Sequence, residues 1–141
     1  MLVAHTQLTP RREEIAPLGF VAHESYLPWL EVGRSDLLKS TGIEYRRLEE
    51  GGKFLPVLEW YMRFRRPVFD GDSLELLTML RTRPALKFRI DYQLLRGKEV
   101  VAVGYTWQGF VSRNGWPCRP PEDFSAMIDR EFDRLERRSD V

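Results

Sequence analysis

Cysteine and histidine are scarce in this chain of 141 residues, which contains one cysteine, Cys118, and two histidines. A single cysteine has no partner for an intrachain disulfide, and the sequence contains no Cys/His spacing of the kind that holds structural zinc. We therefore expect no metal site and a reducing cytoplasm as the compartment. Cys118 lies among prolines without a paired histidine, so we interpret its thiol as unreactive.

Long apolar runs and an excess of charge of one sign are also missing. No stretch approaches the ~18–20 apolar residues of a membrane span, and the first residues, MLVAHTQLTPRREE, are too polar for a signal peptide. The 22 Lys and Arg residues nearly balance the 21 Asp and Glu residues, so nothing in the net charge favours nucleic acid or a membrane as partner. We expect one domain over residues 1–141 with a single sizeable core.

Helical spacing is present in three segments. From Ser25 to Ser40 apolar residues cover most of a helix circumference, which predicts a buried helix with Ser25 as N-cap and Gly42 as a left-handed stop. A short helix is predicted over Glu44–Glu50. The tail, Pro121–Arg138, has acids in its first turn and arginines in its last, which predicts an amphipathic helix packed on the core. The alternative is a helix that binds a partner.

Alternation with a period of two residues marks the strands. Strands are predicted over Phe54–Phe64, which should be long and half-buried, Leu74–Leu80, Leu86–Leu94 and Val101–Trp107. Gly97 and the pair Asn114-Gly115 suit tight turns between such strands. The pattern predicts an antiparallel sheet and an α+β fold class. Large aromatic residues at these spacings are interpreted as core: Trp29, Phe54, Trp60 and Trp107.

One buried helix followed by long alternating strands is the order of the hotdog fold, in which an antiparallel sheet wraps around a long central helix. The blocks LGFVAHESYLPWLEVGRSDLL, FLPVLEWYMRFRRPVFDGDSLEL and NGWPCRPPEDF resemble the 4-hydroxybenzoyl-CoA thioesterase family and its YbgC-like acyl-CoA thioesterases. The likeness covers about residues 15–124. It implies a homodimer, often paired into a homotetramer, with acyl-CoA sites at the subunit interface and no cofactor beyond the coenzyme A of the substrate.

The family pattern Asp-x-x-Gly-x-x-x-His-x-x-Tyr is matched by Gly19, His23 and Tyr26, but Ala16 stands where the family carries its Asp. Thioester hydrolysis requires polarisation of the carbonyl, an activated water or nucleophile, and binding of the carrier. We expect free backbone N–H groups at the start of the Tyr26 helix to stabilise the oxyanion, so only the activating group is in question.

Two residues near Ala16 are candidates for that group. In an extended segment Glu14 would share a face with Ala16, and otherwise it is a solvated charge. The His23 imidazole could accept a proton from water near neutral pH, and otherwise it caps or packs the loop.

A third route needs no local carboxylate. Tyr26 and Arg34 match a tyrosine and an arginine of the enediyne polyketide thioesterases, which resemble this branch and also lack the Asp. The alternative for Arg34 is a structural pair with Glu31 or Glu59. Either of those acids could also serve the site, although a salt-bridged structural role is the simpler interpretation.

Basic residues gather in the two regions that contact coenzyme A phosphates in family members, and arginine forks suit phosphate oxygens. They are Arg81, Arg83, Lys87 and Arg89 around one strand turn, and Arg113 and Arg119 beside the later hairpin. The resemblance selects Gly19, Arg83, Lys87, Arg113 and Arg119 as substrate-binding residues. A solvated surface charge is the alternative for each basic residue.

The leading hypothesis is an acyl-CoA thioesterase with an atypical site. The alternatives are a non-catalytic acyl-thioester-binding protein and a thioesterase that acts on an acyl carrier protein. A hotdog dehydratase is disfavoured because its Asp-x-x-x-x-His run is absent.

Overall fold

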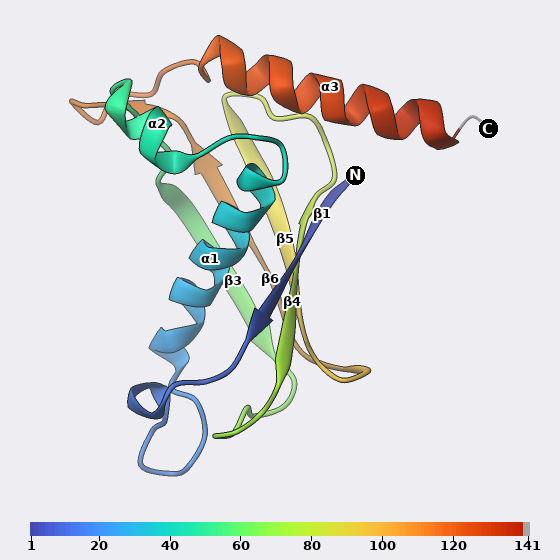
Figure 1. Cartoon of the computed structure of the whole chain (residues 1–141). Helices are drawn as coiled ribbons and strands as arrows, with labels where there is room; N and C mark the ends of the chain where they lie inside the picture. The colour runs from blue at the N-terminus through green and yellow to red at the C-terminus, as the bar shows by residue number, and fades with distance from the viewer. Residues whose placement is uncertain (140–141) are drawn as a thin grey trace.

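The computed structural model describes residues 1–139, in which an antiparallel sheet curves around a central helix (Figure 1). The strands are β1 (Leu2–Leu8), β3 (Val57–Phe64), β4 (Leu74–Leu80), β5 (Lys87–Arg96) and β6 (Glu99–Gly109), in the order β1-β4-β5-β6-β3. Neighbouring strands are antiparallel throughout this sheet. The predicted α+β class, with a sheet wrapped around a helix, is confirmed. The predicted domain also includes residues 140 and 141, which lie outside the described residues.

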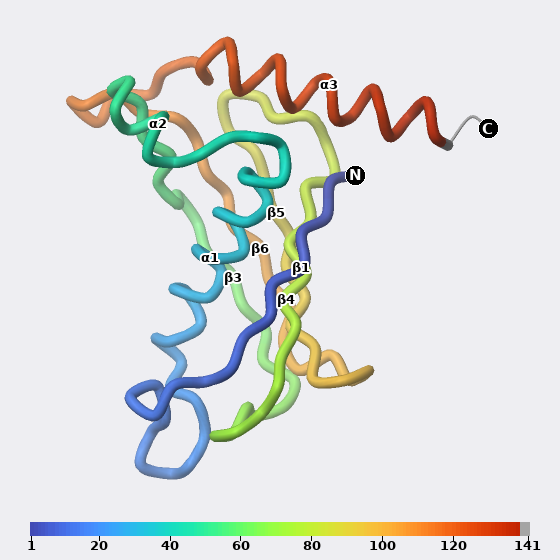
Figure 2. Tube along the Cα trace, viewed as in Figure 1, coloured from blue at the N-terminus to red at the C-terminus, as the bar shows by residue number. Residues whose placement is uncertain are grey.

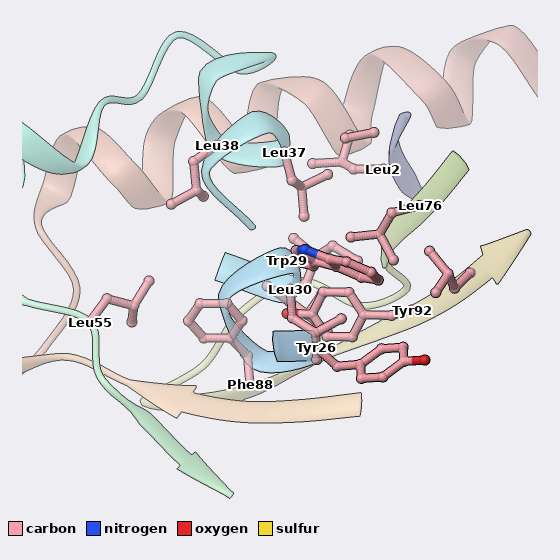
Figure 3. Packing of buried hydrophobic residues seen from close by; sticks show 14 of the residues in the cluster. Leu2, Tyr26, Trp29, Leu30, Leu37, Leu38, Leu55, Leu76, Phe88 and Tyr92 are labelled. Atoms are coloured by element: carbon pink, nitrogen blue, oxygen red, sulfur yellow. The ribbon is translucent and has the colours of Figure 1, made fainter. Parts of the chain in front are cut away.

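The central helix α1 (Tyr26–Lys39) lies against the concave face of the sheet (Figure 1). Its apolar side chains enter one core with the sheet, as Leu30, Leu37 and Tyr92 illustrate in Figure 3. Gly33 permits this close approach, because an added Cβ would fall 2.7 Å from Leu76 Cδ2. Gly42 takes the predicted left-handed conformation, with φ of +88°.

The start of α1 differs from the prediction. A 3-10 turn, η2 (His23–Ser25), precedes the helix, and the Ser25 side chain makes no capping hydrogen bond. The prediction of Ser25 as a side-chain N-cap is therefore wrong. The reason is geometric: Ser25 already has helical dihedral angles, whereas a capping side chain requires an extended backbone at that residue.

The C-terminal helix α3 (Glu122–Ser139) closes one end of the core. Its buried residues are Phe124, Ile128 and Phe132, and the Phe124 ring contacts Phe88 and Phe110. The predicted amphipathic helix packed on the core is confirmed. The Cα trace shows α3 at one end of the sheet and the start of α1 at the other (Figure 2). A short helix, α2 (Tyr45–Glu50), lies near α3, as predicted for residues 44–50.

Two strand assignments need correction. β1 is not among the predicted strands, because its buried positions include the small residues Ala4 and Thr6, which weaken the alternation. The strand predicted over Phe54–Phe64 is divided, since Leu55 and Pro56 separate β2 (Lys53–Phe54) from β3. β2 pairs instead with β7 (Val111–Ser112) in a small second sheet, which the predicted turn at Gly115 follows.

Strand β3 forms one edge of the large sheet and is far more exposed than the predicted half-buried strand. Leu58, Trp60, Tyr61 and Phe64 are 46%, 40%, 47% and 39% exposed. Trp29 does lie in the core, but the core assignment of Trp60 is wrong, because no strand covers the free side of β3.

Residues 1–139 contain no helix with the length and apolar character needed to cross a membrane.

Candidate active site

A tight loop precedes α1 and contains Ala16 and Gly19. The Ala16 N–H donates to the Phe20 carbonyl at 2.8 Å, and the Gly19 N–H donates to the Ala16 carbonyl at 2.9 Å. Gly19 has φ of +95°, a conformation that glycine adopts without steric cost. Gly19 therefore shapes the loop, and its predicted role in substrate binding stays a prediction.

His23 and Tyr26 both contact the ring of Phe64, at the end of the edge strand β3. The His23 imidazole is exposed and stacks on the Phe64 ring at a centroid distance of 5.0 Å. The buried Tyr26 ring meets the same Phe64 ring edge-on at 4.7 Å. A pocket of about 230 Å³ opens beside them, and its lining includes Phe20, His23, Tyr26, Phe64, Arg65 and Arg66.

Backbone donors are present at this pocket, slightly earlier in the chain than predicted. The 3-10 turn uses the N–H groups of Ser25 and Tyr26, which donate to the Ala22 and His23 carbonyls. Within residues 1–139, no backbone carbonyl accepts a hydrogen bond from the His23 or Glu24 N–H. His23 lines the pocket and Glu24 follows it in the chain, so both unpaired amides lie near the positive end of the α1 dipole.

The Tyr26 hydroxyl is a hydrogen-bond donor rather than a base. Burial raises the pKa of Tyr26 to about 12, and the nearby positive charge of Arg96 offsets only part of this effect. The phenol is therefore neutral at physiological pH. Figure 3 shows Tyr26 at the margin of the buried cluster.

Glu14 does not occupy the position that the extended geometry predicts. It ends a 3-10 turn, η1 (Arg12–Glu14), and is 6% exposed. Its carboxylate accepts hydrogen bonds from the Trp29 indole N–H at 2.9 Å and from the Arg11 backbone N–H at 2.8 Å. Both the extended segment and the solvated-charge alternative are therefore wrong, because the turn directs this side chain inward to Trp29.

Replacing Glu14 by alanine is expected to lower the free energy of unfolding by about 2 kcal/mol, because the buried Trp29 N–H and the part-buried Arg11 N–H lose their acceptor. Chemical denaturation measures the change. Glu13→Ala is the matched control, since Glu13 is exposed and its ion pair with Arg11 is long at 3.6 Å, so its effect should stay below about 0.5 kcal/mol. Equal stability of the two variants would show that Glu14 does not fasten the loop.

Arg34 is buried away from the pocket. It lies two helical turns beyond Tyr26, about 12 Å along the axis at 1.5 Å per residue. Its guanidinium donates to the Leu55 carbonyl at 3.0 Å and to the Glu31 carboxylate at 2.9 Å. The structural pair with Glu31 is confirmed. Glu59 is exposed on β3. Its neighbour Trp60 pairs with the buried Thr106 of β6, so Glu59 points to the outer face of the sheet.

The predicted carrier-binding residues lie at the α3 end of the sheet, opposite His23. Arg83 is held by α3, with Asp129 at 2.8 Å and Asp133 at 2.6 Å. Arg119 lines a separate groove there together with Leu86, and the exposed Lys87 begins β5. Arg113 lies in the turn after β7. Within one chain the structure does not bring these four residues to the pocket.

The sequence alone assigned a functional role to only two residues that line the pocket, His23 and Tyr26. Among the others are Phe64, Arg65 and Arg66, at the end of β3 and just after it. The available signal is the run Arg63-x-Arg65-Arg66-Pro67, where cations are concentrated just after an alternating strand. Their position beside His23 depends on long-range contacts that no local pattern reveals.

Comparison with known proteins matches residues 10–128 to the Thioesterase-like superfamily. The relative named "Putative acyl-CoA thioesterase YneP", from Bacillus subtilis (strain 168), is 29% identical over 94 residues, which cover 67% of this chain and 68% of that protein. The structure of hypothetical protein TT1821 from Thermus thermophilus is similar with a TM-score of 0.83 and 30% identity, covering 89% of this chain and 96% of the other. A DHNA-CoA thioesterase from Staphylococcus aureus shares the fold with a TM-score of 0.88 and 20% identity, covering 100% and 97%. The predicted hotdog fold is confirmed.

Proposed function

This chain belongs to the Thioesterase-like superfamily, and on that premise we propose that it is an acyl-CoA thioesterase, hydrolysing a thioester to a free acid and coenzyme A. The observation that carries the proposal is the pocket at the start of α1, where the exposed His23 imidazole lies beside unpaired amides. The names of YneP and of the Staphylococcus aureus structure support the same class of reaction.

In the proposed reaction the thioester oxygen accepts hydrogen bonds from the His23 and Glu24 amides. The His23 imidazole removes a proton from water, and the water oxygen forms a bond to the carbonyl carbon. The carbon–sulfur bond then breaks, and the thiolate takes the proton from the imidazolium. Neutral Tyr26 borders the pocket as a further donor. Glu14 is assigned as a positioning residue, because its carboxylate contacts Trp29 rather than the pocket.

We also propose that the working unit is a homodimer in which two β3 edges face each other. The exposed apolar side chains of β3, Leu58, Trp60 and Tyr61, would be covered by the second copy. A two-fold axis across this edge makes the two β3 strands antiparallel. The α3 end of one copy, with Arg119 and Lys87, then lies beside the His23 pocket of the other. This arrangement explains why the predicted carrier site and the pocket are separated within one chain. A homotetramer stays a prediction.

A second candidate function is a non-catalytic acyl-thioester-binding protein, which the alanine at position 16 favours. The test is a panel of aliphatic and aromatic acyl-CoA and acyl-carrier-protein thioesters, with release of free thiol as the measurement. Turnover of coenzyme A thioesters is expected. Binding of these compounds, measured by calorimetry, without thiol release would support the second candidate. Turnover confined to carrier-protein thioesters would show that the substrate is carried by acyl carrier protein rather than by coenzyme A.

A cytoplasmic location stays a prediction from the single cysteine.

Restoring the family acid by Ala16→Asp is expected to raise kcat about tenfold, which corresponds to about 1.4 kcal/mol of barrier. The Ala16 N–H donates a hydrogen bond to the carbonyl of Phe20, which lines the pocket. A carboxylate at position 16 would therefore lie near the edge of the pocket. Leu18→Asp is the matched control, because it adds the same charge at a loop position that is 81% exposed. An unchanged rate in the Ala16 variant would show that the loop no longer presents this position to the substrate.

A further inference from the structure

Two arginines, Arg65 and Arg66, border the pocket at the start of α1. Neither belongs to the catalytic group proposed above or to the predicted carrier site. Within the described part of the chain, the residues that line this pocket include no Asp or Glu. The pocket therefore has a net positive charge before a substrate enters.

The positive charge continues along an adjoining groove at the end of β3. That groove is lined by Arg63, Arg65 and Arg66, and Glu99 is its one acid among residues 1–139. The Glu99 carboxylate accepts a hydrogen bond from Arg96 at 2.7 Å and lies 3.8 Å from Arg66. In the same part of the chain, Arg63 and Arg65 have no ion-pair partner. Glu99 therefore neutralises only part of this cluster.

The arginine segment is fixed in place by the backbone. The N–H groups of Arg65 and Arg66 both donate to the Val101 carbonyl, at 2.8 and 3.1 Å. The next residues are fastened to the loop before α1, because the Val21 N–H donates to the Val68 carbonyl at 2.8 Å. Val68 is fully buried, so this junction is part of the core. The backbone of both arginines is thereby fixed at the pocket that His23 also lines.

We propose that Arg65 and Arg66 bind a carboxylate at the far end of the acyl group, so that the substrate is the thioester of a dicarboxylic acid. The inference rests on the proposed thioesterase function and specifies its substrate class. Arginine guanidinium groups match carboxylate geometry with paired hydrogen bonds. The thioester carbon at His23 and an anion at Arg65 share one pocket of about 230 Å³, which suits a short acyl chain.

The phosphates of coenzyme A are the other source of an anion. They are separated from the thioester sulfur by the whole pantetheine arm, which is too long for phosphate and thioester to occupy this small pocket together. Arg119 and Lys87, the predicted phosphate ligands, lie at the α3 end of the sheet. An anion on the acyl group is therefore the better match for Arg65 and Arg66.

The test compares glutaryl-CoA with pentanoyl-CoA, two five-carbon thioesters that differ in the terminal carboxylate. For the unmodified protein, kcat/KM should be at least about tenfold higher for glutaryl-CoA, equivalent to about 1.4 kcal/mol. The double variant Arg65→Gln, Arg66→Gln should lose this preference and keep its rate with pentanoyl-CoA. Arg130→Gln, which removes an exposed arginine of α3, is the matched control and should keep the preference.

Other outcomes would overturn the inference. An equal loss with both CoA thioesters in the double variant, but none with the pentanoyl thioester of N-acetylcysteamine, would assign the arginines to the carrier phosphates. Equal hydrolysis of glutaryl-CoA and pentanoyl-CoA by the unmodified protein would show that the arginines do not form a carboxylate subsite. The thioesterase proposal would remain intact. If no thioester is hydrolysed, calorimetry decides: tighter binding of glutaryl-CoA supports the subsite, and equal binding overturns it.

Discussion

Replacing His23 by alanine is expected to lower kcat for acyl-CoA hydrolysis about hundredfold or more, the range that positioned acid–base groups contribute. The imidazole lies exposed at the pocket and stacks on Phe64, so it can reach water there without a large rearrangement. Alanine keeps the backbone N–H groups and the Tyr26 hydroxyl, so the remaining rate reports on these hydrogen-bond donors without the base. Initial rates of thiol release over a range of substrate concentrations separate kcat from KM.

His5→Ala is the matched control for this variant. His5 is exposed on β1, where its imidazole contacts Glu75 at 2.9 Å, and it lies outside the proposed machinery. Its removal should leave kcat within about twofold, because isolated surface changes have small effects. A His23→Ala enzyme that keeps more than a third of the kcat would exclude the imidazole as the base. The search would then turn to another group that lines the pocket.

The double substitution Leu58→Lys, Trp60→Lys on β3 is expected to weaken self-association at least about hundredfold, or about 2.7 kcal/mol. These side chains are 46% and 40% exposed on a free sheet edge, and two facing edges would bring the new charges together. Activity should fall in parallel, because the proposed site needs the carrier residues of a second copy. Sedimentation analysis over a concentration series measures the association.

Val3→Lys is the matched control for the edge experiment. Val3 is 38% exposed on β1, the opposite edge of the same sheet, so the variant places one lysine at an edge that the proposal leaves unpaired. Its association constant should be unchanged. A protein that is monomeric before any substitution, or a β3 variant that stays dimeric, would contradict the proposed interface.

Much of the fold was predictable because it follows from local patterns. The buried helix between Ser25 and Ser40 and the C-terminal helix have apolar residues at helical spacing, and both exist as α1 and α3. Gly42, Gly97 and Gly115 all have positive φ at the ends and turns where the sequence places them. Such features depend on side-chain period and backbone freedom over a few residues, so one sequence determines them.

The candidate site was predictable only in part. Gly19, His23 and Tyr26 follow a short sequence pattern, and the structure places them around the start of α1. Glu14 could not be placed in this way, since its burial depends on the Trp29 indole, fifteen positions away on another element. The ion pairs of Arg83 could not be predicted either, because its partners Asp129 and Asp133 lie on a helix distant in sequence.

The sequence by itself determined the helices α1 and α3, the strands β4, β5 and β6, the loop glycine Gly19 and the pocket histidine His23. Only the tertiary structure showed that Glu14 accepts a hydrogen bond from Trp29, that buried Arg34 pairs with Glu31, and that Arg65 lines the pocket. The physical reason is that the electrostatic and hydrogen-bonding environment of a charged side chain depends on which distant segments fold against it. That information is absent from the spacing of residues along one strand or helix.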